Sequence, residues 1–182
     1  MQPSFEITIR RVQPEEAGIL SVLAKTTFYD TFIHSTTEAD MASYLEEFYS
    51  IEQLQKELDN PDDECYFALH DGIPIAYMRF MEDYSNFPEI KKWKALELKR
   101  IYVLQSYQGK GIAQQLMDFY LEKVQSRNYE VAWLGVWEHN SRAQQFYIKY
   151  GFSFSGYTHD FPIANTPQTD HWYWRFFIDK PE

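Results

Sequence analysis

The segment between residues 95 and 126 constrains the fold of this chain more than any other. Residues 95–103 have the pattern of a strand, and residues 109–126 carry the pattern of a helix. The two are joined directly by a turn with two glycines at 108–111. The start of a helix exposes unpaired N–H groups and the positive end of its dipole, and glycine lets an anion approach the backbone. The segment therefore predicts a phosphate-binding turn.

The spacing within this turn does not fit two common phosphate-binding motifs. A Walker-type loop needs Gly, four residues, Gly, Lys and then Ser or Thr, and Gly109-Lys110-Gly111 does not supply that order. A dinucleotide fingerprint needs a small residue at position 114, where Gln114 stands. Alone, the two glycines are equally compatible with an ordinary strand-to-helix connection.

The rest of the chain predicts a mixed α/β fold in one domain spanning residues 1–182. Strands are predicted at 5–12, 64–70, 73–81, 95–103, 130–136, 152–158 and 170–178. Helices are predicted from Pro14, from near Thr37, at 51–59, at 109–126 and at 140–150. Asp71-Gly72 marks a hairpin. This order gives an early antiparallel part followed by strand–helix–strand crossovers.

Composition restricts the class of partner. The formal net charge of −10 argues against a nucleic-acid partner and against an anionic membrane surface. No apolar stretch approaches the length of a membrane span, and no secretory signal is visible, so we expect a cytoplasmic protein. The five histidines lack metal-ligand spacing, so we expect no metal.

Three segments together resemble the GNAT N-acetyltransferase superfamily. Gln108-Gly-Lys-Gly-Ile-Ala113 matches its Gln/Arg-x-x-Gly-x-Gly/Ala pattern. The upstream strand at 98–103 and the downstream Asn140-x-x-Ala-x-x-Phe-Tyr147 pattern follow in the family's order. The resemblance implies an acyl-CoA N-acyltransferase fold, with a central mixed, mostly antiparallel sheet of about seven strands and helices on both faces. It also implies acetyl-CoA-dependent transfer of an acetyl group to an amine.

The resemblance implies where acetyl-CoA binds. The diphosphate would lie on the backbone amides of Gln108, Gly109, Lys110, Gly111, Ile112 and Ala113. The pantetheine arm would pair with the strand edge formed by Ile101, Tyr102 and Val103, because an unpaired edge can hold an amide-bearing chain. The charge of Lys110 either lies near phosphate or belongs to an ordinary exposed lysine.

Asn140 and Tyr147 are seven residues apart and lie on one side of a helix. Capping of the helix explains Asn140 by itself, and core packing explains Tyr147. The resemblance implies that Asn140 contacts the cofactor and that Tyr147 protonates the departing thiolate as general acid. Glu97, on the preceding strand, is the candidate general base unless it faces solvent, and Tyr102 is a second candidate that would polarise a water.

The first helices and residues 137–140 resemble the bacterial spermidine/spermine N-acetyltransferases. Polyamines are long cations with apolar spacers, which aromatic rings and carboxylates suit. The implied substrate-binding residues are Phe28, Asp30, Phe32 and Glu97. Two other activities stay open, namely acetylation of a protein N-terminus or lysine, and coenzyme A sensing without turnover. Relatives are often dimers, so a homodimer is expected.

Overall fold

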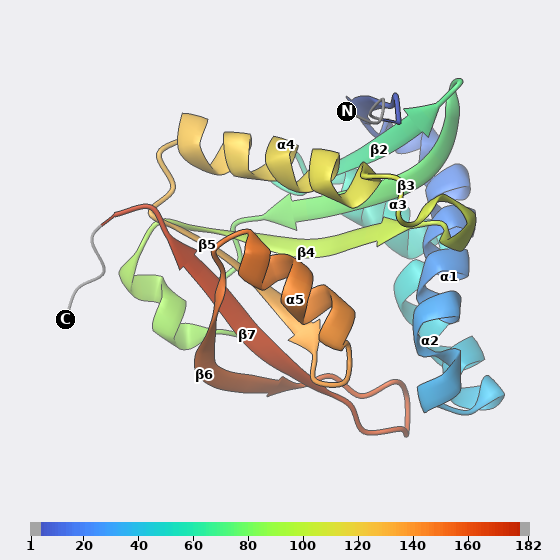
Figure 1. Cartoon of the computed structure of the whole chain (residues 1–182). Coiled ribbons are helices and arrows are strands. Elements are labelled where there is room, and N and C mark those ends of the chain that lie inside the picture. The colour runs from blue at the N-terminus through green and yellow to red at the C-terminus, as the bar shows by residue number, and fades with distance from the viewer. Residues whose placement is uncertain (1–4, 179–182) are drawn as a thin grey trace.

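One seven-stranded sheet in the order β1-β2-β3-β4-β5-β7-β6 organises the chain (Figure 1). The computed structural model describes residues 5–178. The strands are β1 (Thr8–Arg11), β2 (Glu64–His70), β3 (Ile73–Met81), β4 (Ala95–Val103), β5 (Val131–Trp137), β6 (Ser153–Asp160) and β7 (Thr169–Phe176). Neighbouring strands are antiparallel except for the parallel pair β4 and β5. The predicted mixed, mostly antiparallel sheet is confirmed.

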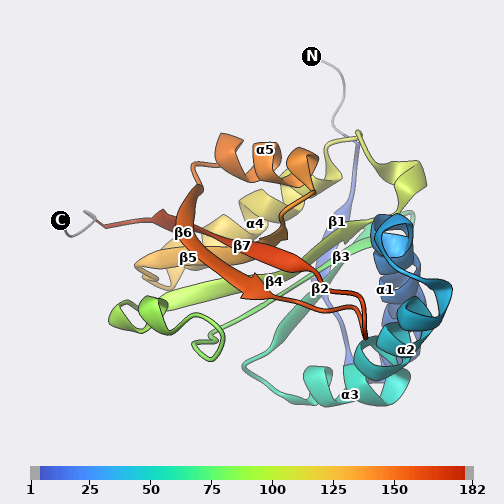
Figure 2. The ribbon, with the colours of Figure 1, turned by 90° about the horizontal axis from the view of Figure 1, so that it is seen from below.

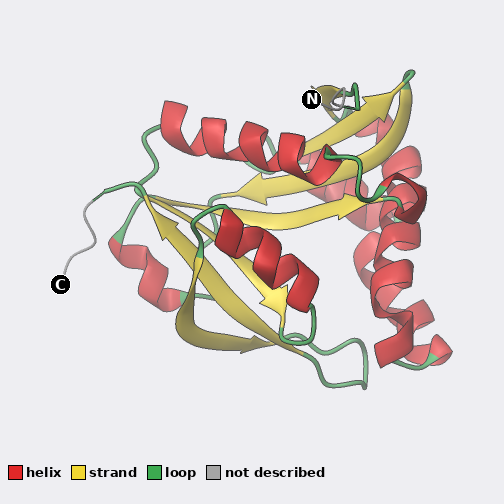
Figure 3. Cartoon of the chain, viewed as in Figure 1, coloured by secondary structure: helices red, strands yellow, loops and turns green. Residues whose placement is uncertain are grey.

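Helices cover both faces of this sheet, as predicted (Figures 2 and 3). They are α1 (Ala17–Phe32), α2 (Glu38–Tyr49), α3 (Ile51–Asp59), α4 (Ile112–Ser126) and α5 (Ser141–Lys149). The apolar sides of α1, α2 and α3 form one buried cluster with β2 and β3, while α4 and α5 pack into a second cluster on the other face. None of the helices in residues 5–178 has the length and apolar character needed to cross a bilayer.

The predicted element boundaries hold best in the middle of the chain. The strands at 64–70, 73–81 and 95–103 and the helix at 51–59 have the predicted bounds. The first strand is shorter than predicted, and Pro14–Glu16 forms a 3-10 turn before α1. The helix predicted from Gly109 begins only at Ile112, because Gly109 and Gly111 have φ angles of +78° and +81°, which are not helical.

The parallel pair β4 and β5 separates after a short stretch of pairing. Only Ala95–Leu98 of β4 pairs with β5, at Val131–Leu134. On its other side β4 carries a bulge, because Arg79 of β3 faces Arg100 and the next residue, Phe80, faces Leu98, so that Lys99 is the extra residue. A bulge bends its strand and increases the local twist. Past this point β4 and β5 diverge (Figure 1).

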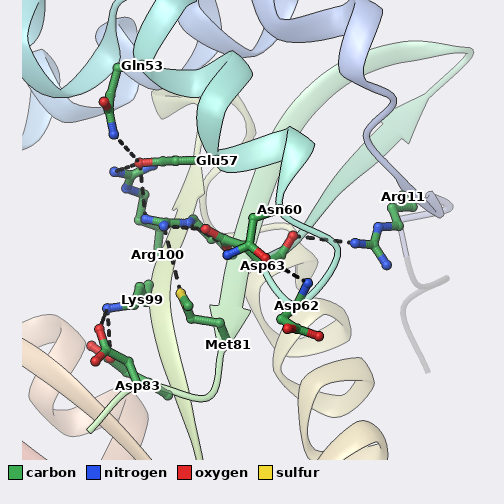
Figure 4. A network of polar contacts seen from close by, with 12 residues as sticks. Arg11, Gln53, Glu57, Asn60, Asp62, Asp63, Met81, Asp83, Lys99 and Arg100 are labelled. Atoms are coloured by element: carbon green, nitrogen blue, oxygen red, sulfur yellow. Dashed lines mark hydrogen bonds and ion pairs between the residues drawn. The ribbon is translucent and has the colours of Figure 1, made fainter. Parts of the chain in front are cut away.

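A network of buried charges anchors α3 to the sheet below it (Figure 4). Arg100 donates two hydrogen bonds to Glu57, at 2.7 and 3.1 Å. Arg79 lies 3.3 Å from Glu57 and donates a 2.7 Å hydrogen bond to Asp63. The ring of Tyr49 lies 4.7 Å from the Arg100 guanidinium carbon. Two arginines from adjacent strands therefore share the carboxylates of the α3 region, and this fixes α3 and the end of α2 over β4.

Glu57→Ala should destabilise the protein by about 3–5 kcal/mol, because it leaves Arg100 buried without its carboxylate. Glu52→Ala is the matched control, since it removes an exposed ion pair with Lys56 in the same helix and should cost less than about 0.5 kcal/mol. Denaturant unfolding followed by circular dichroism measures both. Equal losses in the two variants would show that the buried network does not hold α3.

Candidate active site

A cleft of about 800 Å³ opens where β4 and β5 diverge. Its walls come from α1, the end of β4, the turn before α4, the end of β5, α5 and the start of β7. Among the described residues, no strand pairs with residues 99–103 of β4 on this side, so their backbone N–H and C=O groups border the cleft. Ile101, Tyr102 and Val103, predicted to hold the pantetheine arm, line it. The cleft thus offers a free strand edge of the kind that binds an extended amide chain.

The turn before α4 presents a row of unpaired amides to one end of the cleft. The N–H groups of residues 109–114 have no backbone acceptor within the described chain. The amide of Gln108 was predicted to hold the diphosphate with the others, but it already donates a hydrogen bond to the Gln105 carbonyl at 3.2 Å. Gly111 is the N-cap of α4 in a left-handed conformation, and a side chain there would point into open space. This arrangement fits a diphosphate group.

The other predicted cofactor residues differ in whether they line the cleft. Asn140 and Tyr147 both line the cleft. Asn140 also caps α5, since its Oδ1 accepts the Ala143 N–H at 3.0 Å. Gly109, Gly111, Ile112 and Ala113 line the cleft, whereas Lys110 does not. The Lys110 ammonium lies over the rings of Tyr107 and Phe5, at 4.8 and 5.0 Å.

Tyr147 is buried at the middle of the cleft. It is 7% exposed, and its hydroxyl makes no hydrogen bond within residues 5–178. Burial raises the pKa of Tyr147 above its ordinary value, and the negative charge of Asp170 raises it further. The phenol therefore keeps its proton at neutral pH, as a general acid must.

Two carboxyl groups, one buried and one half-buried, lie near the cleft, and only the second lines it. Glu97, the predicted base, is 6% exposed and lies 2.9 Å from the Lys99 ammonium, but it is not a lining residue. Asp170, at the start of β7, does line the cleft. Burial raises the pKa of both carboxyls to about 7, and their mutual repulsion adds to the shift of Asp170. The role of Glu97 stays a prediction.

An aromatic wall closes the end of the cleft nearest α1. We use this name for Phe28, Phe32, Tyr44, Trp137 and Phe161, all of which line the cleft. The Phe28 ring stacks on Tyr44 at 4.9 Å, and Phe32 meets Trp137 and Phe161 at 5.3 and 5.5 Å. The predicted substrate residues Phe28 and Phe32 belong to this wall, and the exposed Asp30 lies on the rim of the cleft.

The connection between β6 and β7 ties this wall to α2 across the molecule. Thr166 donates to an Asp40 oxygen at 2.7 Å, and Asn165 donates to the other at 3.0 Å. Gln168 donates to the Ser35 carbonyl at 3.1 Å. The strands β4 and β5 no longer pair on the side of the cleft where the aromatic wall lies. There, these contacts join the half of the sheet that ends with β4 to the half that begins with β5.

Sequence reasoning missed several charged residues of the cleft, among them Arg142 and Asp170. Arg142, in the first turn of α5, lines the cleft and donates to Gln108 Oε1 at 2.9 Å, which places a cation beside the free amides of the turn. Arg142 stands at one of the variable positions of the motif that begins at Asn140, so only its positive charge could have indicated a role in the cleft. Asp170 opens a strand far along the chain, and its sequence neighbourhood gives no hint of the cleft.

Comparison with known proteins assigns the family. The profile described as "Acetyltransferase (GNAT) family" matches residues 27–152. An uncharacterised N-acetyltransferase of Lactobacillus delbrueckii subsp. lactis is 33% identical over 165 residues, which cover 90% of this chain and 94% of that protein. An uncharacterised N-acetyltransferase of Mycobacterium bovis is 28% identical over 156 residues, covering 86% of this chain and 94% of the relative.

Solved structures agree on the fold. The PaiA N-acetyltransferase of Thermoplasma acidophilum, in complex with coenzyme A, superposes with a TM-score of 0.76 at 22% identity, over 94% of this chain and 99% of that one. The chain belongs to the GNAT acetyltransferase family and is an acetyl-CoA-dependent N-acetyltransferase. The family predicted from the sequence is thereby confirmed.

Gly111→Trp should abolish coenzyme A binding, because its side chain would fill the space before the free amides of the turn. Gly156→Trp is the matched control, since Gly156 also has a positive φ and open space but lies in β6, outside the cleft. Isothermal titration calorimetry with coenzyme A separates the two. Tight binding by the Gly111 variant would place the diphosphate elsewhere.

Proposed function

We propose that this enzyme acetylates a primary amine of a polyamine such as spermidine or spermine. The observation that carries the proposal is the juxtaposition of the aromatic wall with two carboxylates, Asp170 inside the cleft and Asp30 at its rim. Aromatic faces attract cations and accommodate methylene spacers, and carboxylates suit the ammonium ends of such a chain. The excess of acidic over basic residues also favours the approach of a cation.

The proposed reaction is a direct transfer within a ternary complex. The free amides of the turn and Arg142 would hold the diphosphate, and the open edge of β4 would align the pantetheine arm. The neutral amine attacks the thioester carbonyl carbon, the C–N bond forms and the C–S bond breaks. Tyr147 gives its proton to the departing thiolate, and the proton that the amine nitrogen loses restores the Tyr147 phenol, so that the products are an N-acetylamine and the coenzyme A thiol.

A thiol-release assay with acetyl-CoA tests the acceptor class. Spermidine, spermine, aminoglycosides, amino acids and lysine-containing peptides should be compared at equal concentration, and the polyamines should give the highest kcat/KM. Release with peptides but not with polyamines would replace the proposed acceptor by a protein. Coenzyme A binding without release for any amine would instead favour a sensor.

Tyr147→Phe should lower kcat by on the order of 10²-fold, because phenylalanine has no proton to give. The affinity for coenzyme A should change little, since the turn and the β4 edge are untouched. Tyr173→Phe is the control, as it removes the hydroxyl of a nearby buried tyrosine that does not line the cleft. An unchanged kcat in the Tyr147 variant would remove this residue from the mechanism.

A further inference from the structure

We propose that Asp170 is the general base that deprotonates the acceptor ammonium before it attacks the thioester. The inference rests on the proposed amine acetylation, and it assigns a catalytic role to a residue in the last strand of the sheet. It holds for any amine acceptor, so it does not depend on the amine being a polyamine.

The position of Asp170 meets the first requirement of a base, which is access to the substrate. Its register neighbour on β5 is Trp137, a member of the aromatic wall, and both residues line the cleft. Two residues earlier on β5, and on the same face, stands Gly135, also a lining residue. A Cβ at position 135 would come within 2.9 Å of Asp170 Oδ2 and 2.5 Å of the Trp172 ring. Glycine at 135 therefore leaves the space in which the Asp170 carboxylate is held.

The Asp170 carboxylate lines the cleft without a partner from the protein. Asp170 is half-buried, and within residues 5–178 no group donates a hydrogen bond to it or forms an ion pair with it. The more deeply buried acid Asp63 is bound by Arg79, and Glu97 is paired with Lys99. A substrate ammonium that enters the cleft would supply Asp170 with a donor and a positive charge.

A second unpartnered group stands beside it. The indole N–H of Trp137 is buried and has no acceptor among the described residues. The Trp137 indole and the Asp170 carboxylate, neither of which has a partner among the described residues, thus belong to directly paired residues that line one cleft. This pairing favours a polar ligand at the position rather than a structural role for either side chain.

The electrostatic surroundings of Asp170 favour proton uptake. The titratable groups that face or adjoin it are Glu97 and Tyr102 on β4, Tyr44 on α2, Tyr147 on α5 and His159, its register neighbour on β6. Burial lowers the pKa of His159, so this neighbour is neutral rather than cationic at neutral pH. Burial and the charge of Glu97 raise the pKa of Asp170 to about 7, which suits a base operating near neutral pH.

The proton balance of the step is complete. The carboxylate of Asp170 takes one proton from the R–NH₃⁺ group, which gives R–NH₂ and a neutral carboxylic acid. The amine lone pair then forms the C–N bond, and Tyr147 protonates the sulfur as the C–S bond breaks. The second amine proton leaves the tetrahedral centre and restores the Tyr147 phenol, and the Asp170 proton passes to solvent through the cleft.

The test compares pH profiles of kcat/KM for Asp170→Asn and Glu97→Gln. In the wild type, activity should rise as the pH increases through about 7, because the base works in its ionised form. Asp170→Asn should lose this rising limb of the pH profile and lower kcat by on the order of 10²-fold. Glu97→Gln should keep the limb but move it to lower pH, since removal of the Glu97 charge makes Asp170 a stronger acid. Asp160→Asn, which neutralises an exposed carboxylate of β6, should leave the profile unchanged.

Calorimetric binding of coenzyme A checks that each variant is folded. If Asp170→Asn fails this check, Asp170→Glu carries the test, and it should retain a rising limb at reduced kcat. The inference is overturned if Asp170→Asn keeps its rising limb, or if the limb disappears in Glu97→Gln. A wild-type enzyme that binds coenzyme A but acetylates no amine would refute the proposed function instead, so the two failures are distinguishable.

Discussion

The parting of β4 from β5 is the constraint on which the rest of this structure depends. Parallel neighbours normally share hydrogen bonds along their whole length, but here the ladder ends after Leu98 of β4. The bulge at Lys99 redirects β4 at the same point. Backbone groups that a continuous sheet would satisfy internally are left facing a cleft. An extended ligand that carries amides can satisfy them, so the same break that weakens the sheet creates the binding edge.

A sheet divided in this way needs other contacts to hold its halves in register. Within the half that contains β1 to β4, the buried pairs of Glu57 with Arg79 and Arg100 fix α3 to β3 and β4. Between the halves, Thr166 and Asn165 bind Asp40 and so connect the β6–β7 hairpin to α2. Neither set of contacts lies on the cofactor side of the cleft. The acceptor side is therefore built from segments that meet only through tertiary contacts, whereas the cofactor side is nearly continuous in sequence.

This difference explains which parts of the site were predictable. The turn at 108–113 is local, because its glycines, its helix start and the preceding strand all lie in one stretch of chain, and sequence reasoning located it. The amide of Gln108 was predicted to contact the diphosphate, but a 3-10 turn at Gln105–Tyr107 already uses it. Such short turns leave little trace in a sequence pattern.

The acceptor side was less accessible to sequence reasoning. Placing Glu97 on a strand was correct. The bulge at Lys99, however, determines which side chains of that strand reach the cleft. The sequence around Lys99 contains no residue that indicates a bulge. Asp170 reaches the cleft only because β7 pairs with β5 ahead of β6 in the sheet order. That pairing joins distant parts of the chain, and the carboxylate of an aspartate at the start of a strand otherwise resembles an ordinary solvent-facing group.

Tyr147 and Asp170 approach the cleft from opposite faces of the sheet. Tyr147 belongs to the buried cluster of α4 and α5, while Asp170 shares its face of β7 with Trp172, on the other side of the sheet. Burial raises the pKa of both groups, but the consequence for proton transfer is opposite in the two cases. It keeps the phenol protonated and so fit to donate, and it gives the carboxylate enough proton affinity to accept. In the proposed mechanism, a single physical cause on the two sides of a split sheet thus separates a proton donor from a proton acceptor.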